Sequence, residues 1–395
     1  MEYKLASSTW DQKELEAIQS VIDSDMYSMG QRVKEYETKF ASYFDSRFGI
    51  MTSSGSTANL LMIASMFYTK DKNRRLQRGD EIIVPAVSWS TTYFPLQQFG
   101  LRVKFVDIDK ETLNIDLKSL RNAVSEKTKA ILLVNLLGNP NDFTEIRSIV
   151  GSREITLLED NCESLGASYG EKFTGTFGLM GTFSSFFSHH ISTMEGGMIL
   201  TDDEEIYHIL LSIRAHGWTR DLPKKNWVTG LKSEDEFEES FKFVLPGYNV
   251  RPLEMSGAIG CEQLKKLPGF LAQRRKNAEC FVSLFGNRPF ISIQREISSS
   301  SWFGFSLVLS EDSPLTRTQL VSVLNKNNIQ CRPIVTGNFL KNDEVLAFFD
   351  FEVHGEITNA RHIDENGLFV GNHHVDITDE LIFLDSTIEE AISSC

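Results

Sequence analysis

The sequence predicts an α/β protein with a mostly parallel central sheet covered by helices, followed by a smaller C-terminal α+β domain. Three observations support this prediction. Between about residues 51 and 160, short and continuous apolar segments alternate with helical ones, a pattern typical of parallel strands buried on both faces. Near residue 252 the pattern changes to a mixture of helical and strand-like segments. The length of 395 residues is sufficient for one large core and a second, smaller one.

The part of the chain before residue 51 is predicted to be helical. Thr9 and Gln12 have the spacing of a helix-capping box, and apolar residues follow at helical intervals at Leu15, Ile18 and Ile22. A second stripe with this spacing consists of Val33, Tyr36, Phe40 and Phe44. We expect the aromatic residues of this second stripe to pack in the core.

The alternating part of the chain predicts the central sheet. We expect strands at residues 81–85, 102–107, 130–136 and 156–159. Helices are predicted at residues 56–68, 117–124 and 143–149. Two more strand-like pieces and a helix follow at residues 181–187, 196–201 and 204–215. The polar stretch 224–240 is predicted to be a long surface loop or an insertion.

The C-terminal part is expected to form the smaller domain. It begins with a predicted helix at residues 255–264 and continues with strand-like and helical segments at 302–309 and 315–325. The sequence therefore predicts a large α/β domain over residues 1–251, which includes the N-terminal helices, and a small α+β domain over residues 252–395.

Composition and charge exclude several classes of protein. Hydrophobic residues make up 41% and charged residues 24%, which argues against a disordered chain, a collagen or a coiled coil. No run of about 18 apolar residues is present, and the first residues lack the apolar core of a secretory signal, so we expect a cytoplasmic protein away from membranes. The net charge of −14 argues against nucleic acid as the main partner. A local cationic pocket for an anionic small molecule is compatible with that charge.

The cysteines are expected to be reduced thiols. Their number is odd, and they are widely spaced, at Cys162, Cys261, Cys280, Cys331 and Cys395. The chain contains no C-x-C or C-x-x-C pair, so neither a zinc site nor an iron–sulfur site is expected, and we predict no metal.

Three stretches contain candidate chemical groups, each with a plainer alternative. Residues 53–59 place small and hydroxyl residues before a helix, where they could bind phosphate or simply cap the helix. Asp160 follows a predicted parallel strand, where it could pair with a protonated ring nitrogen or cap the next turn. His189 and His190 lie on a turn between two strands, where such a pair is catalytic or, more commonly, structural.

Taken together, four motifs resemble the sugar aminotransferase family of fold-type I pyridoxal-phosphate enzymes over essentially the whole chain. They occur in the family's order and at its spacing. They are Gly55-Ser56-Thr57, Glu159-Asp160-x-x-Glu163, Ser184 with Glu195-Gly196-Gly197, and Gly247-Tyr248-Asn249-x-Arg251. The resemblance implies a fold-type I aminotransferase-like fold.

One departure from the family pattern concerns the lysine that holds the cofactor covalently. Its position is occupied by His189, and no lysine occurs between Lys172 and Lys224. This pattern resembles the sugar 3-dehydratases of the family, and the lack of closely spaced cysteines favours their cluster-independent kind. That resemblance implies pyridoxamine 5'-phosphate and pyridoxal 5'-phosphate as a cofactor that is not covalently anchored. It also implies a GDP-sugar substrate, with L-glutamate as the amino donor and ammonia as a product.

The resemblance also implies roles for individual residues. His189 would move protons, Asp160 would pair with the cofactor's ring nitrogen, and Glu163 would lie near the ring hydroxyl. Trp89 would stack on the ring, although an unassigned tryptophan more often packs in a core. The phosphate would be bound by Gly55, Ser56, Thr57 and Ser184. Asn249 would reach the cofactor of a neighbouring subunit, which implies a homodimer with shared active sites.

Candidate residues for the nucleotide sugar are Ser28, His216, Arg220, Arg251 and Arg332. Arginine suits a diphosphate because its planar group can donate two parallel hydrogen bonds. For His216 and Arg220, a surface loop is the plainer interpretation, and His373 and His374 are expected to be structural.

Three alternatives remain open from the sequence. A true aminotransferase would need a cofactor lysine at the motif. A catalytically silent, cofactor-binding regulator would not need Asp160 or the phosphate turn. A third alternative keeps the dehydratase chemistry but uses another nucleotide sugar, because the sequence itself does not identify the base.

Overall fold

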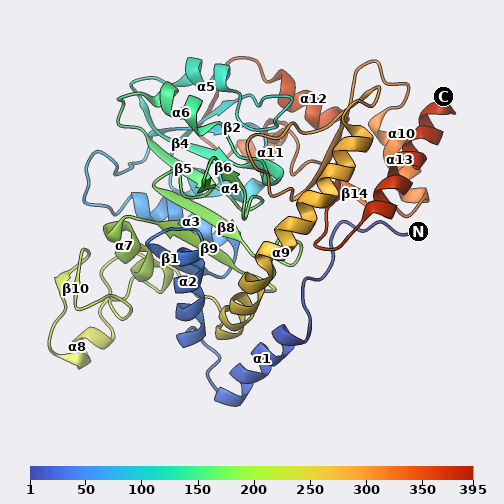
Figure 1. The fold of residues 1–395 in the computed structure, drawn as a ribbon. Coiled ribbons are helices and arrows are strands. Elements are labelled where there is room, and N and C mark those ends of the chain that lie inside the picture. Colours follow the sequence, from blue (N-terminus) through green and yellow to red (C-terminus); the bar gives the residue numbers. More distant parts are fainter. Residues whose placement is uncertain (395) are drawn as a thin grey trace.

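The computed structural model describes residues 1–394, and its largest sheet lies in the centre of the larger part of the molecule (Figure 1). Its eight strands are ordered β1-β9-β8-β5-β4-β2-β3-β15. Neighbours from β8 to β15 pair in parallel, whereas β8–β9 and β9–β1 are antiparallel. The bounds are β1 Phe48–Thr52, β2 Glu81–Pro85, β3 Arg102–Val106, β4 Thr128–Val134, β5 Thr156–Asp160, β8 Met180–Ser184, β9 Gly197–Thr201 and β15 Phe351–Val353. The predicted α/β class and mostly parallel sheet are confirmed.

Both faces of this sheet are covered by helices. Along β2, Ile82 and Val84 pack into one hydrophobic cluster with α3, while Ile83 between them packs into another with α5 and α6. Successive side chains of a strand point to opposite faces, which explains why the buried strands are continuously apolar. The helices of this part are α1 Gln12–Ser24, α2 Gln31–Tyr43, α3 Gly55–Met66, α4 Ser90–Gln98, α5 Leu117–Ala123, α6 Phe143–Val150 and α7 Glu204–Arg214.

A second, smaller sheet is antiparallel throughout, with the order β12-β13-β16-β14 in the described residues. Helix α9 (Glu254–Phe285) runs from α1 and α2 to α13 and so extends along both parts of the molecule (Figure 1). The bounds of the other main elements are β12 Ile291–Ser292, β13 Gly304–Leu309, β14 Cys331–Arg332, β16 Gly367–Gly371, α10 Arg317–Lys326, α12 Thr358–Asn366 and α13 Thr378–Ser393. Short elements are β6 Ser168–Tyr169, β7 Lys172–Phe173, α11 Asp343–Leu346 and two 3-10 turns at Leu136–Gly138 and Phe339–Lys341.

The start of α1 differs from the prediction. The helix begins at Gln12, and its capping box is formed by Asp11 and Glu14 rather than by Thr9 and Gln12. The predicted apolar stripe also faces outward in part, because Leu15 is 53% exposed and Ile22 is 42% exposed. The reason is that α1 packs against α9 through its other face.

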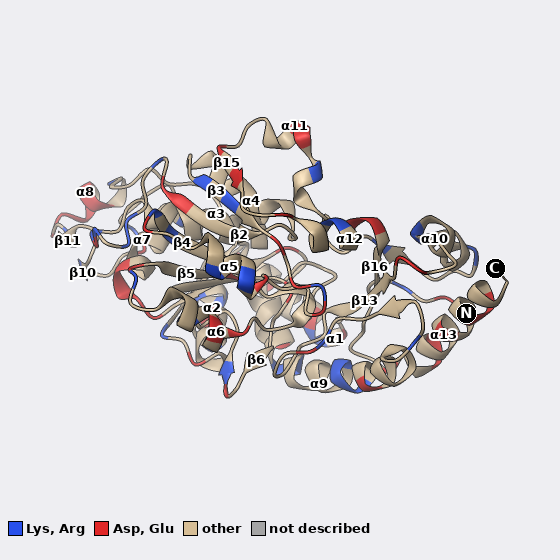
Figure 2. Cartoon of the chain, turned by 90° about the horizontal axis from the view of Figure 1, so that it is seen from above, with Lys and Arg blue, Asp and Glu red and all other residues tan. Residues whose placement is uncertain are grey.

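Two further segments were predicted incompletely. Helix α9 is much longer than residues 255–264, because burial of residues such as Leu271 and Phe281 outweighs the backbone hydrogen bond lost at Pro268. The polar stretch 224–240 contains short elements: β10 Lys225–Asn226, β11 Gly230–Leu231 and α8 Glu236–Ser240. Figure 2 shows that α8 is rich in acidic residues and lies at the end of the molecule opposite α10 and α13.

Two expectations from composition can be compared with the structure. Within residues 1–394, no helix has the length and apolar character needed to cross a membrane. The cysteines of this part are free thiols at Cys162, Cys261, Cys280 and Cys331, while Cys395 lies outside the described residues.

The aromatic residues of the second N-terminal stripe are buried in α2 and the turn after it, as expected from their helical spacing.

Candidate active site

A cavity of about 340 Å³ opens at the carboxyl end of the large sheet. Strands β5 and β8 end in it with Asp160 and Ser184, and Phe303 and Arg332 close it from the smaller sheet. Ligands of open α/β sheets collect at this end of parallel strands. The cavity brings together eight residues predicted from the sequence: Gly55, Ser56, Trp89, Asp160, Glu163, Ser184, His189 and Arg332.

The amino end of α3 forms one wall of the cavity. Ser54 caps this helix, and a Cβ atom at Gly55 would lie 2.7 Å from Cβ of Ser184 and 3.1 Å from Sγ of Cys162, so only glycine fits there. The hydroxyl of Ser56 donates to Oγ1 of Thr91 at 2.9 Å. Free amide groups at a helix start attract anions, and this wall can therefore hold a phosphate.

Thr57 was predicted to bind phosphate, but it does not line the cavity. Its hydroxyl donates to the carbonyl of Ser54 and accepts from the Ser54 amide, while its own amide donates to Oγ of Ser54. Thr57 therefore completes the helix cap of α3.

Asp160 is held by a network of neutral donors. Its Oδ2 accepts from Nδ2 of Asn59 at 2.8 Å and from Oγ1 of Thr92 at 2.7 Å, and its Oδ1 accepts from the Cys162 amide at 3.1 Å. Asn59 is fixed in turn by the hydroxyl of Thr182. No cation bonds to Asp160 within the described chain, so this carboxylate can pair with a positively charged ring nitrogen.

Glu163 and Arg332 both line the cavity and are paired there, with Nη2 of Arg332 3.8 Å from Oε1 of Glu163. Burial raises the pKa of Glu163 to about 7, although Arg332 and the amide of Leu137 act against this shift. Among the described residues that line the cavity, Arg332 is the only arginine or lysine. The cavity thus has one cationic group and no lysine amine.

His189 reaches the cavity from the loop between β8 and β9. Its ring lies against Phe303, with centroids 5.1 Å apart, and its Nδ1 is buried without a hydrogen-bond partner. Burial lowers the pKa of His189 to about 3, and the charges of Arg332 and Arg274 add to that shift. The imidazole is therefore neutral near pH 7 and can accept a proton.

Four of the remaining predicted residues lie together outside the cavity of this chain. His216, Arg220 and Arg251 surround the ring of Trp218, and the Arg220 guanidinium is 4.3 Å from the ring centroid. Asn249 belongs to this group because its Oδ1 accepts from Nε of Arg251 at 3.0 Å. Ser28 forms an isolated β-bridge with Leu253.

Other cavity residues were not predicted from the sequence, among them Asn59, Ser88, Thr91, Phe186, Glu195 and Phe303. Asn59 could have been predicted from the sequence, because it lies four residues after Gly55 on the same helix and so on the same face. Phe303 could not, because it comes from a distant segment of the chain. His373 is structural, as expected, since it bonds to Ser7 and to the carbonyl of Lys4.

Residues 8–381 match the DegT/DnrJ/EryC1/StrS aminotransferase family. The chain belongs to this family. It is 67% identical over 387 residues to a protein of Escherichia coli O55:H7 (strain CB9615 / EPEC) named GDP-4-keto-6-deoxy-D-mannose 3-dehydratase, covering 98% of this chain and 99% of that protein. The predicted family and the fold-type I aminotransferase-like fold are thereby confirmed.

Solved structures of such dehydratases have nearly the same fold. A mutant GDP-4-keto-6-deoxymannose-3-dehydratase with bound GDP-perosamine is 66% identical, with a TM-score of 0.97 over 98% of this chain and all of the other. Another structure, with a trapped PLP-glutamate geminal diamine, is also 66% identical, with a TM-score of 0.96 over 98% of this chain and 100% of the other.

The cavity fits a pyridoxal-type cofactor by the chemistry of its groups. The start of α3 and Ser184 suit a phosphate, the uncompensated Asp160 suits a protonated ring nitrogen, and the 51%-exposed ring of Trp89 offers a face for stacking. The described residues contain no group of three or more histidine, cysteine, aspartate or glutamate side chains that could hold a metal ion.

Proposed function

We propose that this protein is a hydro-lyase that removes the C-3 hydroxyl of GDP-4-keto-6-deoxy-D-mannose and yields GDP-4-keto-3,6-dideoxy-D-mannose. Ammonia is released, and L-glutamate restores the pyridoxamine 5'-phosphate form of the cofactor. We propose that this step belongs to colitose biosynthesis. The observation that carries the proposal is His189 in a lysine-free cavity with Asp160, in a chain 67% identical to a protein of that name.

The chemistry that the bound cofactor supplies is an amine for condensation with the C-4 ketone and a ring that withdraws electrons. Asp160 pairs with the ring nitrogen and keeps it protonated. Gly55, Ser56 and Ser184 hold the phosphate, Trp89 covers the ring, and Glu163 lies near the ring hydroxyl. Because no lysine lines the cavity, the cofactor is held by these contacts without a covalent bond.

His189 is the proton-transfer residue. A neutral imidazole can take a proton from carbon and return it to the departing hydroxyl. Unlike a lysine amine, it cannot form a Schiff base with the cofactor's aldehyde. Burial, together with the charges of Arg332 and Arg274, lowers the pKa of His189 and keeps the ring neutral before reaction, so that its nitrogen can take a proton.

An assay with both substrates distinguishes this function from its alternatives. We expect GDP-4-keto-6-deoxymannose and glutamate together to give ammonia and 2-oxoglutarate in equal amounts. An aminotransferase would give 2-oxoglutarate and an amino sugar without ammonia, and a silent regulator would give neither. Replacing GDP by another nucleotide in the substrate tests the choice of base. Absence of ammonia with an intact protein would contradict the proposal.

We also propose that the protein is a homodimer with shared active sites. His216, Arg220, Asn249 and Arg251 form a polar group outside the cavity of their own chain, and Ser28 forms a β-bridge with Leu253, two residues after Arg251. In the proposed dimer, this group of one subunit lies against the cavity of the other. There Asn249 reaches the cofactor phosphate, and the arginines, together with Arg332, bind the GDP diphosphate.

The division into domains at residue 252 and the cytoplasmic location stay predictions from the sequence.

Complementation between two inactive variants tests the shared site. In Asn249→Asp a carboxylate faces the cofactor phosphate and is repelled, while His189→Asn lacks the proton-transfer group. In a mixed dimer, one of the two sites has both intact residues. Since half of the dimers are mixed, exchange of subunits should restore up to about a quarter of wild-type activity. No recovery despite demonstrated exchange would place Asn249 in the site of its own chain.

A further inference from the structure

Residues 3–14, here called the N-terminal strap, cross from the smaller sheet to the loop that carries His189. Figure 1 shows this segment running beside α9 from the region of α13 to α1. Within the described chain, none of the strap residues lines the cavity. Any effect of the strap on catalysis must therefore pass through other residues.

The first part of the strap is fixed to the smaller sheet. The amide of Tyr3 donates to the carbonyl of Asn328, and the carbonyl of Tyr3 accepts from the amide of Gln330. The Tyr3 hydroxyl donates to the carbonyl of Gly371 at the end of β16, at 2.5 Å. Tyr3 is 1% exposed, so this end of the strap is anchored in the core.

The second part of the strap holds Ser192, three residues after His189. The indole Nε1 of Trp10 donates to the carbonyl of Ser192 at 2.9 Å. The amide of Ser192 donates to Oε1 of Gln263, at 2.9 Å, and the same oxygen accepts from the hydroxyl of Thr9 at 2.6 Å. Both main-chain groups of Ser192 are thus bound by side chains of the strap and of α9.

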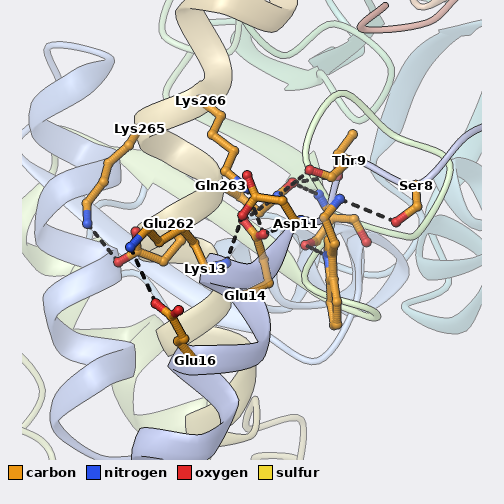
Figure 3. A network of polar contacts seen from close by, with 12 residues as sticks. Ser8, Thr9, Asp11, Lys13, Glu14, Glu16, Glu262, Gln263, Lys265 and Lys266 are labelled. Atoms are coloured by element: carbon orange, nitrogen blue, oxygen red, sulfur yellow. Dashed lines mark hydrogen bonds and ion pairs between the residues drawn. The ribbon is translucent and has the colours of Figure 1, made fainter.

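The side-chain amide of Gln263 is held by hydrogen bonds at both its oxygen and its nitrogen. Its Nε2 donates to the carbonyl of Thr9 at 3.1 Å and to Oε1 of Glu14 at 2.8 Å, and Glu14 is paired with Lys266. Figure 3 shows Thr9 and Glu14 arranged around Gln263 with these contacts. Because Gln263 is fully buried, a different orientation would leave buried polar groups without partners.

His189 has no comparable support of its own. Its side-chain Nδ1 is buried without a hydrogen bond, and the one main-chain bond of its amide goes to the carbonyl of Phe186 in the same loop. The position of its ring therefore depends on where the loop is held. Between His189 and β9, His190 is held by its side chain, whose Nε2 bonds to the carbonyl of Ser301 at 3.0 Å. The nearest residue on that side whose main chain is held by hydrogen bonds is Ser192, which is 2% exposed.

We propose that Trp10 and Gln263 are positioning residues for His189, acting through the two main-chain groups of Ser192. The strap connects the smaller sheet, which supplies Phe303 and Arg332, with the loop that supplies His189. It thereby sets the place of the base relative to the rest of the cavity. The inference rests on the proposed role of His189 in the dehydration.

Two conservative variants test this inference. Trp10→Phe keeps the ring and removes the donor to Ser192, and Gln263→Met keeps the shape and removes the acceptor. We expect each to lower kcat by about tenfold or more, up to about 10²-fold, because small displacements of a reacting group are costly, with KM changed less than about twofold. Lys265→Met is the matched control: it removes the exposed ion pair to Glu262 on the same helix without touching Gln263 or Ser192, and its kcat should stay within about twofold of wild type.

A double variant shows whether the effect passes through His189. Trp10→Phe added to His189→Asn should cause no further loss of kcat beyond about twofold, because the base is already absent. A loss as large as that in the wild-type background would overturn the proposal, since the strap would then act on the fold or the cavity in general.

Amide hydrogen exchange gives a readout that needs no substrate. Residues 186–196 should exchange faster in Trp10→Phe and in Gln263→Met, with the two sheets unchanged, and should not do so in Lys265→Met. Unchanged exchange in this loop, or faster exchange throughout the chain, would contradict the positioning role. Because exchange is independent of the reaction, it remains a test even if the assay shows a different substrate.

Discussion

His189→Asn is expected to lower turnover by about 10²–10⁴-fold, the usual effect of removing a positioned proton-transfer group. Asparagine is close to histidine in size and polarity, so the loop between β8 and β9 should keep its conformation. Its amide cannot accept a proton near neutral pH, and the reaction loses its base. The rate is measured as ammonia and 2-oxoglutarate formed from the GDP-sugar and glutamate, with cofactor binding followed by absorbance.

The control for this prediction is His354→Asn, a histidine outside the cavity, which should retain wild-type activity. The pH dependence of stability gives a second check. Because the pKa of His189 is about 3 in the fold and near 6.5 when unfolded, the unfolded chain binds the extra proton between these values. Acidification from pH 7 to 5 should therefore destabilise the cofactor-free wild type more than the variant. Activity within a few-fold of wild type would assign the proton transfer to another residue.

Asp160→Asn is expected to weaken cofactor binding and to lower turnover by about 10²–10³-fold, as for other preorganised electrostatic groups. The carboxylate accepts hydrogen bonds at both oxygens, from Asn59, Thr92 and the Cys162 amide. An amide nitrogen in place of one oxygen would face donors and leave them unpaired, at a cost of about 1–3 kcal/mol in stability. It would also remove the negative charge opposite the ring nitrogen. Cofactor affinity, turnover and the melting temperature are measured together.

Asp202→Asn is the matched control for this second variant. Asp202 directly follows β9 of the same sheet and accepts from Oγ of Ser46 and the Arg47 amide, but it lies outside the cavity. It should lose some stability and keep its turnover. If Asp160→Asn bound the cofactor as tightly as wild type, the ring nitrogen would have to pair with another group.

Much of the architecture could be predicted from the order of the residues. Strands β2, β3, β4, β5 and β8, helices α3, α5 and α6, and the helix start near Gly55 follow from local periodicity and capping, which act over a few residues. Helix α4 and the edge strand β15 were not predicted. The same holds for candidate groups near the ends of strands, such as Asp160 and Ser184. The length of α9 did not follow, because its continuation past Pro268 depends on packing against distant segments.

The sequence by itself determined the family and showed that His189 replaces the cofactor lysine. Both conclusions follow from the identity and order of the residues in the four motifs, without any knowledge of their positions in space. Tertiary structure decided which of the candidates share one cavity. It placed Arg332 and Phe303 beside His189, left Thr57 in a helix cap, and gathered Asn249 with Arg251 outside the cavity of their own chain. The physical reason is that a place in the cavity depends on contacts between remote segments: Phe303 and Arg332 are more than a hundred residues from His189 in the chain. Such contacts are fixed by the packing of the two sheets and leave no local pattern in the sequence.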